Sequence, residues 1–157
     1  MKRSLTPLFL VILVLAVANT TLVAAGVVPI YSGFPPLKES AAYQQYRSRP
    51  VSELSKLIYL IDRFADTDIQ ILHDSHYFDA KFAGHVARWF LSRHYRGETT
   101  SQWILRWCNA SVPAGNLIWV KLPAGQFKLA REILLGELRD LETLAAETPA
   151  AAVKMPK

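Results

Sequence analysis

Side chains able to bind a metal ion gather in one short segment of the chain. His73 and His76 flank Asp74, and His85 follows a short distance along. Imidazole nitrogens and carboxylates are common ligands of zinc, copper and nickel. Odd spacing along a strand places His73 and His76 on opposite faces unless a turn at Asp74-Ser75 reorients one of them. His73 and His76 are therefore candidate metal ligands, with solvent-facing turn residues as the alternative interpretation.

Other catalytic chemistry has little support in the sequence. His85 lies beside the core-facing position of Val86, where a structural hydrogen bond to the preceding hairpin and ligand contact or proton transfer are alternative roles. The single cysteine, Cys108, falls on an apolar helix face, where thiols are usually inert. We expect no cofactor. The enzyme hypothesis is limited to a histidine-based or metal-assisted hydrolase that uses His73, His76 and His85.

Four tryptophans offer large aromatic faces for a ligand or a protein partner. Trp103 and Trp107 share the apolar side of an expected helix, so packing in the core is their default role. Trp89 and Trp119 fit the core pattern less well. Together with His85, they are the candidate residues for contact with a ligand or partner.

A basic strip accompanies the helix that carries His85. Its members fall off the apolar stripe of the helix: Lys81, Arg88, Arg93 and Arg96. Such a strip suits anionic lipid or an acidic partner, and a solvated helix face is the alternative explanation.

The N-terminus has the layout of a secretory signal. Lys2 and Arg3 precede an apolar run from Leu8 to Ala18, and small residues up to Ala25 suit signal peptidase. We expect a signal peptide over residues 1–25 and a periplasmic or secreted protein. The alternative is a retained membrane anchor over residues 8–30, which is long enough to span a bilayer.

Length and charge limit what remains after cleavage. The chain has 157 residues and a formal charge of +5, so removing residues 1–25 with their two cations leaves 132 residues and +3. That length suits one domain, and the charge is too small to indicate nucleic acid. We divide the remainder into an extended lead rich in proline and aromatic residues (26–50) with a helical turn near Ser40 to Arg47, a domain (51–146) and a disordered tail (147–157).

The domain is predicted to be α+β, with four helices packed on a small three-stranded sheet. Ser52, Asp79 and Thr99 or Thr100 are suited to cap helices. The expected order is a helix over 52–64, a hairpin over 69–78, helices over 79–97 and 99–113, a strand over 117–122 and a helix over 127–146.

Several short blocks resemble a bacterial family of small exported proteins of unknown function, the YfeK-like proteins. The matching blocks are Ile71-Leu72-His73-Asp74-Ser75, Phe78-Asp79-Ala80, Ala83-Gly84-His85-Val86, Thr99 to Ile104 and Ala114 to Val120. Asp74-Ser75 replaces the Asn-Gly turn of that family, Ser101 replaces a Glu, and Leu117-Ile118 replaces Pro-Tyr. The resemblance covers about a third of the chain and implies a fold and export, without catalytic residues.

Taken together, these patterns favour a non-catalytic binding or interaction module in the periplasm or outside the cell. Its partner would be an unknown protein or a component of the cell envelope, and no nucleic acid is expected. A membrane would be a partner only if the N-terminal segment is retained, which would give a membrane-tethered accessory protein.

Overall fold

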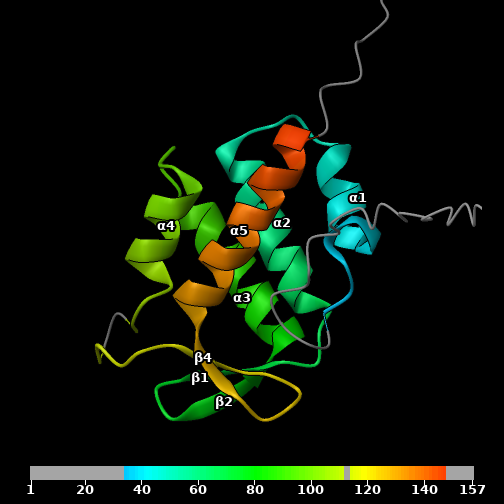
Figure 1. Ribbon diagram of the computed structural model, residues 1–157. Helices are drawn as coiled ribbons and strands as arrows, with labels where there is room; N and C mark the ends of the chain where they lie inside the picture. Colours follow the sequence, from blue (N-terminus) through cyan, green and yellow to red (C-terminus); the bar gives the residue numbers. More distant parts are fainter. Residues whose placement is uncertain (1–33, 112–113, 148–157) are drawn as a thin grey trace, which may run out of the picture.

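The structure is a computed structural model that describes residues 34–111 and 114–147, and it has the α+β fold that the sequence predicts (Figure 1). In chain order the elements are η1 (Leu37–Glu39), α1 (Ala41–Arg47), α2 (Glu53–Ala65), β1 (Gln70–His73), β2 (His76–Asp79), α3 (Ala80–His94), α4 (Thr100–Trp107), β3 (Trp119–Lys121), β4 (Phe127–Leu129) and α5 (Ala130–Glu147). The described residues thus form five α-helices and four strands, against the four helices and three strands expected. The predicted signal peptide lies outside the described residues, as does the predicted tail apart from Glu147.

The four strands form one antiparallel sheet at one end of the helices, in the order β2-β1-β3-β4 (Figure 1). The predicted hairpin is present, with His73 opposite His76 across a two-residue turn. Asp74 and Ser75 both have positive φ, 46° and 65°. Two such residues suit the right-handed twist of a tight hairpin. The turn therefore brings His73 and His76 to the same face of the sheet.

The fourth strand corrects the prediction of a helix that begins at Phe127. Phe127–Leu129 pairs with β3, and α5 begins only at Ala130. A turn reverses the chain before it, because Gly125 adopts a φ of +84° and Leu122 N–H donates to the carbonyl of Gln126 at 2.8 Å. The apolar residues of this stretch fit both a helical face and an edge strand, and the turn decides in favour of the strand.

Residues 34–50, predicted to be an extended lead, contribute to the core, and α1 lies where the helical turn is predicted. They form η1 and α1, where Ser40 Oγ accepts a hydrogen bond from Tyr43 N at 3.2 Å and begins α1. Leu37, Tyr43 and Tyr46 are buried against α2 and α5. Their aromatic and aliphatic side chains fill the space beside those helices, so the core begins before Val51.

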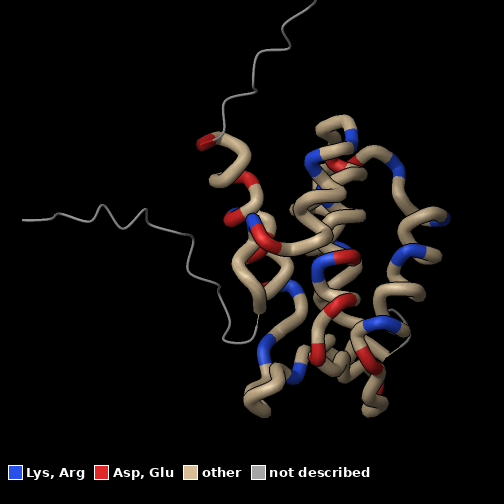
Figure 2. The backbone as a smooth tube through the Cα atoms, turned by 90° about the vertical axis from the view of Figure 1, so that its right-hand side faces the viewer, with Lys and Arg blue, Asp and Glu red and all other residues tan. Residues whose placement is uncertain are grey.

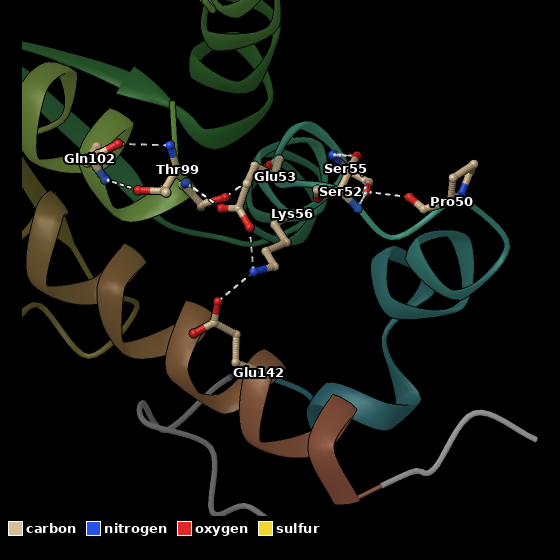
Figure 3. A network of polar contacts seen from close by, with 9 residues as sticks. Pro50, Ser52, Glu53, Ser55, Lys56, Thr99, Gln102 and Glu142 are labelled. Carbon is tan, nitrogen blue, oxygen red and sulfur yellow. Dashed lines mark hydrogen bonds and ion pairs between the residues drawn. The ribbon is translucent and has the colours of Figure 1, made fainter. Parts of the chain in front are cut away.

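The predicted helix caps are present at Ser52, Asp79 and Thr99. Figure 3 shows how the first turn of α2 also joins α4 and α5. Glu53 accepts a hydrogen bond from Thr100 N at 2.7 Å, and Lys56 bridges Glu53 and Glu142 at 2.8 and 2.7 Å. The bonds from Lys56 and Thr100 lower the pKa of Glu53 to about 2. One carboxylate thus fixes the positions of two helix starts.

A buried ion pair lies deeper between α2 and α5. Arg63 Nε donates to Glu137 Oε1 at 2.9 Å, with the two side chains only 3% and 8% exposed. Tyr59 donates its hydroxyl proton to the same oxygen at 2.6 Å, and Arg63 Nη2 donates to the carbonyl of Pro35 at 2.6 Å. Burial, and then the charge of Glu137, raise the pKa of Tyr59. The pair ties the start of the described chain to its first long helix and its last.

Within residues 34–111 and 114–147, no helix has both the length and the apolar composition needed to cross a bilayer.

We expect Glu137→Ala to lower the free energy of unfolding by about 3–5 kcal/mol, because it leaves the Arg63 charge and the Tyr59 hydroxyl buried without a partner. Urea denaturation measures this. The matched control is Glu142→Ala, which removes an exposed α5 carboxylate and should cost at most about 1 kcal/mol. Equal losses in the two variants would contradict the importance of the buried pair.

Candidate functional site

An apolar cavity of about 390 Å³ lies inside the helical layer, against the face of the sheet that the helices cover. Its wall is formed by residues of α2, α3, α4, α5 and the sheet, and nearly all of the lining side chains are aliphatic or aromatic. Ligand pockets typically have volumes of 300 to about 1,000 Å³ and apolar walls with few polar groups. Both the size and the lining therefore suit a small apolar ligand.

The position of α3 creates this cavity. Gly84 of α3 lies against Ala65 of α2 so closely that a Cβ atom at Gly84 would be 2.8 Å from the Ala65 Cβ. This contact holds α3 against α2 and the first hairpin, the elements it packs on most. Ala83, Val86 and Ala87 then line the space between α3 and the rest of the domain. The small size of two of these three side chains leaves room there.

The spacing of apolar residues predicts a buried stripe of Ala83, Val86, Ala87, Phe90 and Leu91 on α3. Val86 departs from it, because 43% of its surface is exposed. Leu91 is buried as predicted, and Phe90 is half-buried. The rotation of α3 that places Gly84 on α2 turns Val86 toward the mouth of the cavity.

Two tryptophan rings that line the cavity carry buried indole N–H groups without a partner among the described residues. Trp103 and Trp107 line the cavity, and neither Nε1 atom has a hydrogen-bond partner among the described residues. Phe90 packs edge-on against both rings, with centroids 6.2 Å from Trp103 and 5.1 Å from Trp107. A buried donor without an acceptor costs about 1–3 kcal/mol. Because both Nε1 atoms are buried, the two rings present mainly carbon atoms to the cavity.

The thiol of Cys108 is in the same wall and is not activated. Burial raises the pKa of Cys108 to about 12. Since the thiolate is the nucleophile, a thiol with this pKa is unreactive near neutral pH. Cys108 therefore contributes surface to the cavity.

The candidate metal residues His73 and His76 share one face of the hairpin. His73 lines the apolar cavity, its Nδ1 3.6 Å from an Asp74 carboxylate oxygen, while His76 is exposed and donates from Nδ1 to the carbonyl of Asp74 at 2.8 Å. Ser111 and Asn116 donate to Asp74 at 2.7 and 3.0 Å, and these bonds lower its pKa. The Asp74 carboxylate thus anchors the hairpin tip to the loop that precedes β3. Across the described ranges, no cluster of three or more His, Cys, Asp or Glu residues is placed to hold a metal ion.

The candidate contact residues His85, Trp89 and Trp119 lie apart from this cavity. His85 is exposed in a separate polar depression that Asp62 and Arg88 also line. Trp89 is 52% exposed on α3, and the guanidinium of Arg93 lies 4.6 Å from its ring centroid. Trp119 pairs with Leu72 and Leu129 on the sheet face opposite the helices. The three residues do not form one site.

The residues that do line the cavity were assigned to the core by sequence reasoning. Trp103 and Trp107 are on the apolar face predicted for their helix, and apolar spacing along a helix is the same for core residues and for cavity-lining residues. One feature of the sequence indicated an additional apolar surface. The helix over 79–97 has more apolar positions than a single buried stripe needs, with Phe82 and Trp89 in addition.

No family model, no curated protein and no solved structure matches the chain. The resemblance to the YfeK-like proteins stays a prediction.

The contact between Gly84 and Ala65 is testable by a double-mutant cycle. We expect Gly84→Ala to force α3 away from α2, because the Ala65 methyl group has no rotamer that yields space. Changing Ala65 to Gly should relieve the clash, which gives a coupling of about 1–2 kcal/mol between the two positions in urea denaturation. The cycle cancels the helix propensity of alanine at position 84. A coupling near zero would show that α3 is not held by this contact.

Proposed function

We propose that this protein is an exported, non-catalytic binding module that takes an apolar ligand into the cavity beneath α3. The observation that carries the proposal is the cavity itself, which has about 390 Å³ of space with an apolar wall in a domain of this size. Interiors without a ligand function are close-packed and leave few voids larger than a water molecule. A space of this volume is therefore best explained by a molecule that fills it.

The lining of the cavity defines the ligand further. Nearly all of its side chains are aliphatic or aromatic, including the rings of Trp103 and Trp107. A long apolar chain, such as that of a fatty acyl compound, would fill this space and cover its apolar wall.

The hydrolase alternative would need converging catalytic groups. His73 lines the apolar cavity, His85 lines the polar depression, and His76 lines neither of these two. The high pKa of Cys108 also leaves the cavity wall without a reactive thiol. The arrangement of the described residues supports binding more than hydrolysis.

The test of binding uses a bromine-labelled fatty acid, which quenches tryptophan fluorescence at close range. We expect quenching in the parent protein and at least about tenfold weaker affinity in Ala87→Phe, where the new ring occupies the cavity. Ala145→Phe is the matched control, because it adds the same ring at an exposed position of α5. Thermal unfolding of both variants shows whether each is folded.

A second variant locates the ligand even if Ala87→Phe does not fold. The variant Trp103→Phe/Trp107→Phe keeps only Trp89 and Trp119 as fluorophores, and neither lines the cavity. Most of the quenching by the bound fatty acid should therefore disappear. Parent protein that is not quenched, or a double variant that is quenched as strongly as the parent, would overturn the proposed site.

Export is tested by the mass of the mature protein. We expect cells that express the full chain to accumulate a periplasmic form whose intact mass corresponds to a start at Gly26. Ala25→Leu should prevent cleavage at that position, because signal peptidase requires a small residue there. A full-length mass in the membrane fraction of the parent would contradict cleavage and make residues 8–30 an anchor.

A further inference from the structure

The charge of the described protein is concentrated on one side. Residues 80–107, which form α3 and α4, contain five Lys or Arg and one acidic residue, a formal charge of +4. The other described residues contain nine Lys or Arg and twelve Asp or Glu, a formal charge of −3. Figure 2 shows α3 at the right of the tube with basic positions along it and no acidic one. The molecule therefore presents α3 to any anionic surface it meets.

The same helix exposes an apolar stripe. Phe82, Val86 and Trp89 are 52%, 43% and 52% exposed and recur at the spacing of one helix face. On neighbouring α4, Leu105 is 54% exposed. Large apolar side chains in a row on a helix with basic neighbours are the pattern of helices that lie in a membrane interface.

Acidic groups near α3 neutralise only part of its charge. Arg88 forms an ion pair with the buried Asp62, and Glu98 accepts a hydrogen bond from the backbone N–H of Arg96 at 2.8 Å. Asp66 and Asp79, the N-cap of α3, line the same depression as Lys81. Lys81 and Arg93 form no ion pair with any residue of the described chain. These two exposed cations lie at the two ends of the apolar stripe, where they can meet lipid phosphates.

We propose that the outer face of α3 docks on an anionic lipid bilayer, with Phe82, Val86 and Trp89 inserted between headgroups and Lys81, Arg93 and Arg96 on the phosphates. This interaction needs neither a retained N-terminal anchor nor a ligand in the cavity. Val86 also lines the cavity, so docking would place the cavity beside the acyl chains of the bilayer.

The test is co-sedimentation of the full chain, purified as the cell processes it, with phosphatidylcholine vesicles and with vesicles of equal parts phosphatidylcholine and phosphatidylglycerol. Binding should be stronger to the anionic vesicles and should weaken as salt increases. The variant K81Q/R93Q/R96Q should bind them about 100-fold more weakly. Trp89→Ser should bind about tenfold more weakly.

The matched control is K38Q/K128Q/R139Q, which removes the same charge from exposed positions on η1, β4 and α5 and should bind like the parent. None of Lys81, Trp89, Arg93 and Arg96 lines the apolar cavity, so the affinity for the brominated fatty acid, measured by quenching without vesicles, should be unchanged. That separates failure of docking from failure of the ligand site.

Three results would overturn docking: equal binding to both kinds of vesicle, unchanged binding of K81Q/R93Q/R96Q, or the same loss in the control triple. A concentration-dependent dimer that Trp89→Ser abolishes would assign this face to a second copy of the chain instead.

Discussion

The ion pair between Arg63 and Glu137 is the constraint on which the rest of the fold depends. A charge this deeply buried is tolerated only when its partner is held in good geometry. Glu137 accepts hydrogen bonds from both the Arg63 guanidinium and the Tyr59 hydroxyl. These bonds fix the rotation of α5 and its position along α2. Arg63 also holds the carbonyl of Pro35, which sets where the segment before η1 crosses these helices. Apolar packing alone would allow α5 to slide along α2.

With α2 and α5 held together, the cavity results from the way in which α3 packs against α2. α3 is drawn onto α2 by the absence of a side chain at Gly84, and its small residues face inward where larger ones would close the core. Phe82 and Trp89 are about half exposed, while Phe90 and Leu91 pack inward. The orientation of α3 thus accounts for both the exposed apolar side chains and the apolar cavity.

Local signals in the sequence predicted most of the helices and strands. The features that the sequence did not predict depend on long-range contacts. Ser52, Asp79 and Thr99 cap their helices as expected, since each cap depends on a few neighbouring residues. The strand at Phe127–Leu129 was missed because pairing with β3 decides its conformation. The cavity could not be predicted, because Trp103 has the same pattern whether it faces another side chain or a void. His73 and His76 lie on the same face, as the sequence allowed if a turn formed at Asp74-Ser75.

The sequence separation of the buried pair has a consequence for the order of folding. Arg63 and Glu137 are 74 residues apart, and α5 is the last of the described helices. Until α5 has been synthesised, Arg63 lacks its carboxylate and α2 has no surface on which its charge can be buried. Closing so long a loop is slow compared with local helix formation. We therefore expect this domain to fold only once its C-terminal helix is present, a property that suits the proposed export, because a translocation pore passes unfolded chains.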